Sequence, residues 1–390
     1  MSGHVVIPVQ AGSTGESLPH IVHLCKYYPP LWWGGVPCYV QLAVQELSRY
    51  YRVTVLSANS GWKRSEESRG NLRVIRVPRV TEIRSTTICP TLPWELVRLR
   101  PDVIHLHFPD PMAHLAYAAA RVSGKLVITW HGDISRQWFL LHLYRPFLRW
   151  IFRSADRIIV SSPAFRDGSR LLEGFRERCT VIPFGIDVER FRLNEAVERT
   201  REVLRQRFGE RVVLFVGRLH EQKGLDYLLR AMVGLNARLV LVGTGYMERT
   251  LRRLAVELGL GDRVAFEGEL PPSEIVPYLY LCSLLVLPSV NTGESFGLVQ
   301  LEAMACGKPV VSTNIPTGVP WVNQHGRTGL VVPPRDPDAL RSAIRQLLDD
   351  PSLRQNLGEA GRKRVESQFT LEQHIRQILN VYATVLAQGN

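Results

Sequence analysis

Two glutamates that lie eight residues apart, Glu294 and Glu302, flank the predicted start of a helix. The apolar run 283–287 before them predicts a buried strand, and Ser295 is the predicted N-cap of a helix that ends at Gly307. The first N–H groups of such a helix are unpaired and attract an anion, while a carboxylate can accept hydrogen bonds from two neighbouring hydroxyls of a sugar or ribose ring. The pattern indicates a site for hydroxyls beside an anion, although two solvated helix-terminal acids would also produce it.

A glycine turn with two cations follows another predicted strand, 211–216. Arg218 and Lys223 lie five residues apart directly after Gly217. Arginine can chelate a phosphate with two hydrogen bonds, and lysine supplies a compact charge. The turn therefore favours a phosphate site, although a surface turn has the same composition as often.

Histidines and a glycine pair follow predicted strands in the first half of the chain. His131 stands at the carboxyl end of an apolar strand, where open parallel sheets bind ligands, and we interpret it as functional. His105 and His107 lie within the predicted strand before it and could either act in the site or fill the strand end. Gly34 and Gly35 could let the backbone approach a phosphate closely.

The segment 136–153 mixes arginines with aromatic residues at helical spacing, and Pro146 should kink it. One interpretation is an amphipathic helix that packs on a sheet. The other is an interfacial membrane helix whose arginines contact anionic head groups. The arginines are Arg136, Arg145, Arg149 and Arg153.

A chain of 390 residues exceeds one compact core, so we expect two domains. Strands and helices alternate from His20 onward and restart after the segment 183–187, which predicts two doubly wound α/β domains. The predicted divisions are a domain at 1–188 whose residues 1–19 form a loose arm, a domain at 189–369, and a helix at 370–390 that packs back towards the first domain.

Composition narrows the partners and the compartment. The net charge of +12 favours an anionic partner: nucleic acid, an anionic membrane surface or a phosphorylated small molecule. No helix-turn-helix, RNP or zinc-finger spacing accompanies the charge, so no nucleic-acid partner is expected. The six cysteines form no C-x-x-C pair, and no run suits a signal peptide or a spanning helix. A cytoplasmic protein with free thiols and no zinc site is expected.

Taken in order and spacing, the turn 217–224, the glutamates around 295–298 and the segment 303–310 closely resemble the retaining glycosyltransferases of family 4, the glycosyl transferases group 1. Segments 183–187 and 326–333 resemble that family too. The resemblance covers roughly residues 20–385 and is most specific in the carboxyl half. It implies an α/β fold of the GT-B type, in which two Rossmann-like doubly wound domains face each other across a cleft.

The resemblance also implies roles for the site residues. Arg218 and Lys223 would stabilise the departing diphosphate, Glu302 would hold the ribose, and Glu294 and His131 would contact the donor sugar. The remaining implied donor-binding residues are Gly34, Gly35, Gly217, Ser295, Phe296, Gly297, Leu298 and Leu270. Family members need no metal, so we expect neither a metal ion nor a cofactor beside the GDP- or UDP-linked substrate.

The expected activity is retaining transfer of a hexose to a glycan or lipid-linked acceptor in cell-envelope polysaccharide synthesis, with peripheral binding at the inner face of the plasma membrane. Mannose from GDP-mannose is favoured, and Glu269 or Glu274 could read the guanine. The alternatives are a UDP-sugar transferase acting on a small-molecule acceptor and a non-catalytic nucleotide-sugar-binding protein. A GT-B phosphorylase or epimerase fits less well, because phosphorylases need a pyridoxal lysine and a far longer chain.

Overall fold

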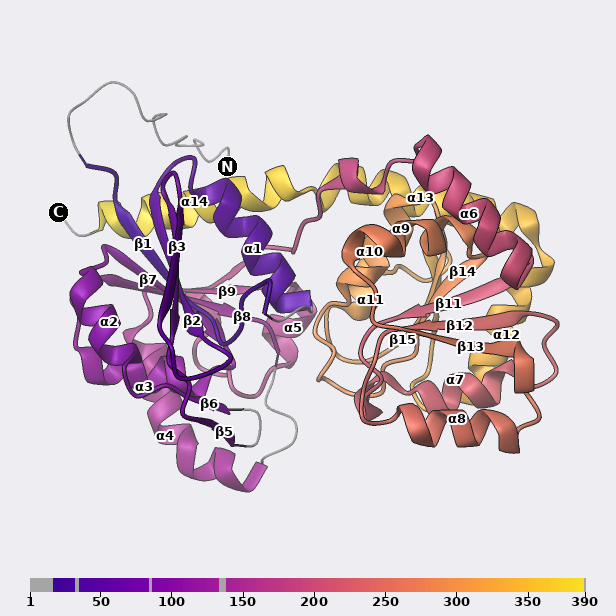
Figure 1. Cartoon of the computed structure of the whole chain (residues 1–390), viewed down its shortest axis with the longest axis horizontal. Helices are drawn as coiled ribbons and strands as arrows, with labels where there is room; N and C mark the ends of the chain where they lie inside the picture. The colour runs from indigo at the N-terminus through magenta and orange to yellow at the C-terminus, as the bar shows by residue number, and fades with distance from the viewer. Residues whose placement is uncertain (1–16, 32–34, 84–85, 133–137, 389–390) are drawn as a thin grey trace. The chain divides into compact units, whose positions relative to one another are not determined.

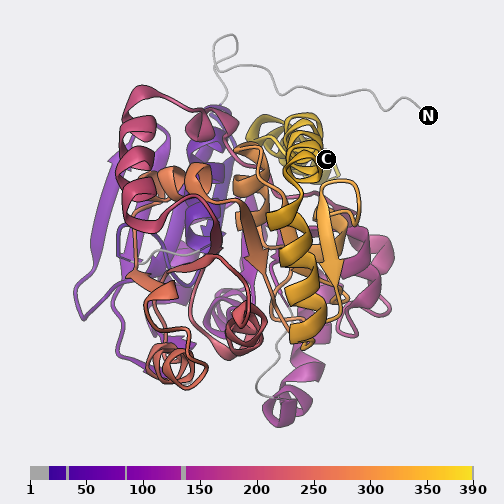
Figure 2. The same cartoon turned by 90° about the vertical axis from the view of Figure 1, so that its right-hand side faces the viewer.

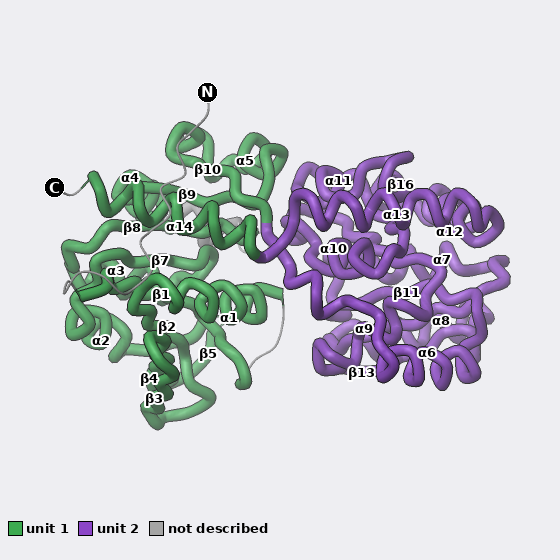
Figure 3. The backbone as a smooth tube through the Cα atoms, turned by 90° about the horizontal axis from the view of Figure 1, so that it is seen from above, with its two compact units in different colours: residues 1–183, 372–390 green, residues 184–371 purple. Residues whose placement is uncertain are grey.

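The computed structural model describes residues 17–31, 35–83, 86–132 and 138–388, and for 138–143 it describes the backbone alone. Most of the predicted amino-terminal arm, together with Gly34 and Arg136, lies outside these residues. The chain forms two compact units, unit 1 with residues 1–183 and 372–390, and unit 2 with residues 184–371 (Figure 3). The sequence places the same divisions at 188–189 and 369–370.

Unit 1 is built on an eight-stranded sheet with the order β10-β9-β8-β7-β1-β2-β4-β3, in which every pairing is parallel except that of β3 with β4. Chain order reverses between β1 and β7, so these two strands form the switch point of a doubly wound sheet. The strands are β1 (His20–Leu24), β2 (Arg52–Ala58), β3 (Ser65–Arg69), β4 (Leu72–Val77), β7 (Val103–Phe108), β8 (Lys125–Trp130), β9 (Arg157–Val160) and β10 (Cys179–Val181).

Helices cover both faces of this sheet: α1 and α14 lie over one face, and α2, α3 and α4 over the other (Figure 1). The helices are α1 (Gly35–Leu47), α2 (Leu92–Leu99), α3 (Pro111–Ala120), α4 (Trp138–Ser154), α5 (Pro163–Gly168) and α14 (Leu371–Ala387). A short hairpin of β5 (Thr81–Ile83) and β6 (Thr86–Ile88) stands apart from the main sheet. Helix α4 runs through Pro146.

Unit 2 repeats the doubly wound plan with six parallel strands in the order β13-β12-β11-β14-β15-β16. The switch point lies between β11 and β14. The strands are β11 (Val212–Val216), β12 (Arg238–Val242), β13 (Val264–Gly268), β14 (Leu284–Leu287), β15 (Val310–Thr313) and β16 (Gly329–Val332). Helices lie on both faces of the sheet (Figures 1 and 2). They are α6 (Glu195–Phe208), α7 (Leu225–Met232), α8 (Glu248–Glu257), α9 (Pro272–Leu281), α10 (Leu298–Ala305), α11 (Val319–Val322), α12 (Pro337–Asp349) and α13 (Pro351–Gln368).

The strands and helices predicted from the sequence are present close to their expected bounds, and the two-unit α/β architecture is confirmed. The predicted N-cap of α10 is wrong. Gly297, not Ser295, occupies that position, with a left-handed backbone (φ 72°). A Cβ at Gly297 would lie 2.5 Å from Cδ2 of Leu287, so both conformation and space require glycine there. Among the described helices, none is long and apolar enough to cross a membrane.

Candidate functional site

Two loops meet at the switch point of unit 2, one after β11 and one after β14. The backbone N–H of Val290 donates a 3.0 Å hydrogen bond to the carbonyl of Gln222. Gly224 has a left-handed backbone (φ 63°), and a Cβ there would lie 2.3 Å from the carbonyl oxygen of Pro288. Because only glycine permits this approach, the turn with the two cations is held directly against the loop that carries Glu294.

This contact brings together two predicted site residues that lie 71 positions apart in the sequence. The Nζ of Lys223 donates to Oε2 of Glu294, and Oγ of Ser289 donates to the same oxygen over 3.3 Å. The two charged side chains are only 15% and 12% exposed. Desolvation strengthens such a pair, so the ammonium is held in place at the switch point. The sequence analysis did not identify Ser289, a small polar residue whose partner is set by the loop.

Arg218, by contrast, is exposed, and its guanidinium makes no hydrogen bond or ion pair with any residue that the structure describes. Gly217 before it has φ 149°, and a Cβ there would lie 3.7 Å from Nζ of Lys223. The two predicted cations therefore belong to one turn. Lys223 is paired with a carboxylate, whereas Arg218 is open to an anion.

The residues that lead into α10 contribute backbone rather than side chains. Phe296 is buried and packs against the rings of Phe184, Trp321 and Phe369, so its side chain belongs to the core. The carbonyl of Ser295 accepts a hydrogen bond from the N–H of Gly318. What this segment offers a ligand is the first N–H groups of α10, beginning at the half-buried Leu298.

Glu302 lies on α10 and is partly buried, and burial raises the pKa of its carboxyl to about 7, while Arg190 opposes that rise. Among the described residues, no hydrogen bond or ion pair uses this carboxylate. A desolvated carboxyl without a protein partner is a group that a pair of ligand hydroxyls could satisfy.

The strand end that the sequence analysis connected with the nucleotide base is β13. Its Glu267 is occupied, because Arg207 binds it with hydrogen bonds of 2.7 and 2.8 Å and Tyr278 donates a third of 2.7 Å. Glu269 is exposed and Leu270 is partly buried just beyond the strand. Glu274 is also exposed, in the first turn of α9.

Unit 1 carries a different kind of site at its own switch point. His23 on β1 and His105 and His107 on β7 point to one face of the sheet, since His105 is in register with His23 and side chains alternate along a strand. His131 follows β8, and all four rings are buried. Nδ1 of His23 lies 3.0 Å from Nε2 of His107, and Nδ1 of His107 lies 2.9 Å from Nε2 of His131. The structure therefore joins the predicted His131 to both histidines that the sequence left open.

Two hydroxyls complete this cluster. Tyr382 of α14 contacts Nδ1 of His105 at 2.5 Å and Nε2 of His23 at 3.2 Å. Oγ1 of Thr129 lies 2.6 Å from Nε2 of His105. The sequence analysis missed His23 and Tyr382. A histidine inside an apolar strand was the available signal for the first, and nothing local marks the second.

Desolvation lowers the pKa of all four histidines, to about 3 for His107 and well below the usual value for His23, His105 and His131. All four rings are therefore neutral at physiological pH, and each carries one proton. Ring nitrogens of His23, His105 and His107 lie within 4.8 Å of one another, a spacing that a metal ion could use. The contacts described above occupy these nitrogens with hydrogen bonds.

An Asp-x-Asp tripeptide, whose two carboxylates could hold a metal ion, is present at Asp336–Asp338. Its first carboxylate caps α12 by accepting from the N–H groups of Asp338 and Ala339. The second pairs with Arg341 at 2.6 Å. These contacts assign the tripeptide a structural role at a helix start.

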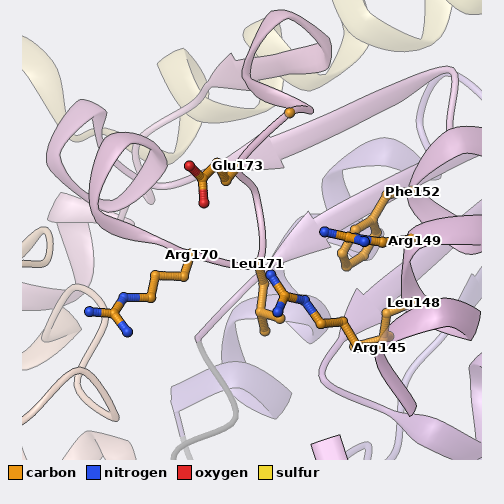
Figure 4. Close-up of a pocket in the computed structure, with 8 residues that line it drawn as sticks. Arg145, Leu148, Arg149, Phe152, Arg170, Leu171 and Glu173 are labelled. Atoms are coloured by element: carbon orange, nitrogen blue, oxygen red, sulfur yellow. The ribbon is translucent and has the colours of Figure 1, made fainter. Parts of the chain in front are cut away.

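The segment interpreted either as a helix packed on the sheet or as an interfacial membrane helix is α4, whose side chains are described from Tyr144 onward. Its aromatic residues divide: Phe152 is buried against Phe108 and Trp130, whereas Trp150 is 44% exposed. Phe152 therefore belongs to the core, as the interpretation of a helix packed on the sheet requires, and is not available to lipid. Arg145 and Arg149 line a hollow of about 150 Å³ together with the segment 170–174 (Figure 4).

Gly35 begins α1 and is exposed, and its neighbour Gly34 lies outside the described residues. The first N–H groups of α1 therefore start at a predicted phosphate-binding glycine.

Comparison with protein families gives two matches that together span most of the chain. The family described as "Glycosyl transferases group 1" matches residues 197–364. "Glycosyltransferase Family 4" matches residues 33–190.

Three relatives extend the comparison. The chain is 38% identical over 269 residues to the D-rhamnosyltransferase WbpZ of Pseudomonas aeruginosa, covering 69% of this chain and 70% of the relative. It is 31% identical over 376 residues to O-antigen chain mannosyltransferase C of Escherichia coli, covering 94% and 98%. It is 32% identical over 349 residues to a GDP-mannose-dependent alpha-(1-6)-phosphatidylinositol monomannoside mannosyltransferase of Mycolicibacterium smegmatis, covering 84% and 89%.

Solved structures agree on the fold. Sucrose-phosphate synthase from Thermosynechococcus elongatus superposes with a TM-score of 0.81 at 25% identity, covering 95% of this chain and all of that one. HepE of Anabaena, solved with UDP-glucose, superposes with a TM-score of 0.75 at 21% identity, covering 94% and 99%. The second likeness concerns the fold alone. With the two doubly wound units, these matches confirm the GT-B fold expected from the sequence.

Proposed function

Because the chain belongs to the glycosyl transferases group 1, we propose that it transfers a hexose from a nucleotide sugar to a glycan or lipid-linked acceptor with retention of anomeric configuration. The observation that carries the proposal is the turn at the switch point of unit 2. There Lys223 is held by Glu294 while Arg218 remains open to an anion.

The chemistry requires this arrangement of charge. Cleavage of the anomeric C–O bond leaves positive charge on the sugar and negative charge on the departing phosphate oxygen. Arg218 and Lys223 would stabilise that phosphate, and the N–H groups at the start of α10 would add to them. Since these groups supply the positive charge, we propose that transfer needs no metal ion.

Glu294 and Glu302 would hold hydroxyl groups, the first those of the sugar and the second those of the ribose. His131 is the residue of unit 1 that we assign to the donor sugar. In the proposed step the acceptor hydroxyl attacks the anomeric carbon from the face that the phosphate leaves. The new C–O bond forms as the old one breaks, and the acceptor proton passes to the leaving phosphate oxygen.

We propose GDP-mannose as the donor. Two of the relatives above are mannosyltransferases by name, and one is named as dependent on GDP-mannose. Glu269 and Glu274 are exposed beyond β13 and could accept hydrogen bonds from guanine. The acceptor would belong to a cell-envelope polysaccharide or its lipid carrier, reached from the cytoplasmic face.

A panel of GDP- and UDP-linked sugars tests the proposal by release of nucleotide, with and without EDTA. Release of GDP from GDP-mannose that survives EDTA is the expected result. Release of UDP alone would show that the donor is a UDP-sugar and not GDP-mannose. If EDTA abolished the activity and magnesium restored it, the proposed independence from metal ions would be overturned. Tight binding of a nucleotide sugar without any release would support the alternative of a non-catalytic binding protein.

A further inference from the structure

A buried acid, Asp110, lies two residues beyond the carboxyl end of β7, at the switch point between β7 and β1. Ligands of doubly wound sheets bind outside the carboxyl ends of the strands at such a point. Asp110 is only 3% exposed, so its carboxylate is almost completely withdrawn from solvent. Burial of an acid is unfavourable unless partners satisfy its oxygens, so this position needs a physical explanation.

One oxygen of this carboxylate has a structural role. Oδ1 accepts hydrogen bonds from the backbone N–H groups of Met112 and Ala113, over 3.1 and 3.3 Å, and thereby caps the start of α3. Among the described residues, no hydrogen bond or ion pair uses Oδ2 of Asp110. The cap therefore accounts for one oxygen of the carboxylate, and the second oxygen is left for a further partner.

Two other helices begin with the same Asp-Pro pair and show what capping alone requires. Asp336 precedes Pro337 at the start of α12, and Asp350 precedes Pro351 at the start of α13. Both carboxylates accept hydrogen bonds from backbone N–H groups of their helix, as Asp110 does. Asp336 is partly exposed, and Asp350 is exposed. Since capping does not require burial, the cap does not explain why Asp110 is buried.

The charge of the carboxylate limits what its second oxygen can bind. Burial raises the pKa of the Asp110 carboxyl to about 6, while the capping N–H groups and Lys26 oppose that rise. Lys26 lies two residues beyond the end of β1 and is paired with Glu82 at 3.6 Å, so it does not serve Asp110 alone. At pH 8 the carboxyl is ionised, and an ionised carboxylate only accepts hydrogen bonds. Hydroxyl groups are suitable partners for Oδ2.

We propose that Oδ2 of Asp110 accepts a hydrogen bond from a hydroxyl group of the acceptor sugar. This assignment rests on the function proposed above, in which a hydroxyl of a glycan or lipid-linked acceptor attacks the donor. A carboxylate repels the diphosphate of the donor, and the donor hydroxyls are already assigned to Glu294, Glu302 and His131. The acceptor is therefore the substrate whose hydroxyl groups suit Asp110.

Asp110→Asn separates the contact with the acceptor from the helix cap. Asparagine caps a helix about as well as aspartate, because its side-chain oxygen can accept the same two N–H hydrogen bonds. Its NH₂ group then replaces Oδ2 and cannot accept a hydrogen bond from a hydroxyl. Asp336→Asn is the matched control, because it makes the same change at the cap of α12, which has no assigned contact with a substrate.

The first measurement is release of nucleotide by the full chain at saturating donor, with increasing amounts of the lipid-linked glycan fraction extracted from the source cells. For Asp110→Asn, the amount of extract that gives half-maximal stimulation should rise on the order of tenfold, the effect of one hydrogen bond to a charged group. The KM for the donor should change far less. Asp336→Asn should change neither value.

The second measurement is unfolding by urea, which tests whether the carboxylate serves the fold alone. Asp110→Asn keeps the cap and removes a buried charge, so at pH 8 it should unfold at the same urea concentration as the wild type or at a higher one. Asp110→Ala loses the cap and should unfold at a lower concentration. If Asp110→Asn is destabilised as much as Asp110→Ala, the second oxygen serves the fold and the proposal is wrong.

The kinetic outcomes distinguish this proposal from the proposed function. Unchanged half-maximal stimulation in Asp110→Asn, or an equal rise in Asp336→Asn, would overturn the contact with the acceptor although the wild type transfers sugar. If the extract does not stimulate a wild type that releases nucleotide, the proposed acceptor class is wrong, and the role of Asp110 is refuted with it. A wild type that releases no nucleotide from any donor would refute the proposed transfer itself and this inference together.

Discussion

The two units place different chemistry at the same topological position. In unit 2 the loops at the switch point join a lysine to a glutamate and leave an arginine exposed. In unit 1 the switch point carries histidines that burial keeps neutral. Both sheets are doubly wound, so strand order does not cause the difference.

The difference shows that one fold can carry two kinds of binding chemistry at its switch point. A phosphate that gains charge needs fixed positive groups beside it. Sugar hydroxyls need donors and acceptors whose directions are set, and a net charge is not required. The charged site belongs to the turns after the strands, whereas the neutral one is built largely from the strands themselves. Substitutions at the charged site of unit 2 and at the neutral site of unit 1 should therefore impair the protein in different ways.

The largest effect is expected at the open cation. Arg218→Ala should lower kcat about 100- to 1000-fold, because the guanidinium stabilises charge that develops only as the phosphate leaves. The measurement is steady-state release of nucleotide. The control is Arg211→Ala, at the residue directly before β11. It removes a cation paired with Asp349 and should leave kcat unchanged. An Arg218→Ala enzyme with wild-type turnover would contradict the leaving-group role.

Glu302 gives the next largest effect, on donor binding. Glu302→Gln should weaken donor affinity about 10- to 100-fold, because hydrogen bonds to a charged group contribute more than those to an amide. The carboxyl has a pKa of about 7 in the free protein. Donor binding by the carboxylate should therefore tighten as the pH rises from 6 to 8, and the variant should lose that dependence. Calorimetric titration at several pH values measures both.

The same carboxyl predicts the opposite trend for stability. Its pKa in the folded protein lies above its ordinary value of 4.5, so the folded state binds the proton more tightly than the unfolded state. Stability without donor should therefore fall as the pH rises from about 4.5 to about 7. Glu302→Gln should raise the unfolding free energy at pH 8 by up to about 3 kcal/mol and have little effect at pH 4. Equal urea midpoints for the wild type and Glu302→Gln at both pH values would contradict this prediction.

The loop contact beneath the charged pair should be sensitive to a single methyl group. Gly224→Ala adds a Cβ against the carbonyl oxygen of Pro288 and also strains a left-handed backbone. Gly234→Ala is the matched control, since it has a similar φ of 77° with nothing within 4 Å of the added atom. The control should lose about 1–3 kcal/mol of stability from backbone strain, and Gly224→Ala should lose more and reduce turnover. Equal losses would mean that the loops adjust freely.

Much of this arrangement could be predicted from the sequence, for physical reasons. The buried strands are short apolar runs, and the turn at Gly217 follows one of them, so Arg218 and Lys223 could be placed at a strand end. The edge strand β3 was not predicted, because its residues are polar and largely exposed. It pairs only with β4, so it needs no run of apolar residues to form. The sequence could not show that the side chain of Phe296 packs in the core, because the rings that it contacts, Phe184, Trp321 and Phe369, are distant in the sequence.

The histidine cluster at the switch point of unit 1 could be predicted only in part. His131 was identified because it follows an apolar strand. Its connection to Tyr382 could not be, because the tyrosine lies 277 residues from His105 and 359 from His23. Likewise, the sequence identified Lys223 and Glu294 but assigned them to different parts of the substrate, whereas in the structure they bind each other. Local patterns place side chains on strands and turns, but they do not specify long-range partners.

The smallest expected effect concerns a surface of unit 1 away from both switch points. Arg145 and Arg149 are exposed on α4, and Trp150, which directly follows Arg149, is 44% exposed. A basic residue near an anionic membrane contributes about 1 kcal/mol, so the two arginines supply roughly 2 kcal/mol. Arg145→Gln with Arg149→Gln should lower binding to anionic vesicles by about 30-fold. Arg121 lines the neighbouring hollow, and Arg121→Gln is the control. This variant tests whether loss of any nearby cation lowers binding to the vesicles.

Sedimentation with anionic and neutral vesicles at two salt concentrations measures this effect. Because the arginine contribution is electrostatic, binding to anionic vesicles should fall as salt rises, and neutral vesicles should bind only through the aromatic side chains. Burial of Phe152 limits that aromatic contribution, so the predicted binding is weak and depends strongly on salt. Equal recovery in the supernatant under all four conditions would show that α4 serves packing alone. The acceptor would then have to reach the protein without help from this helix.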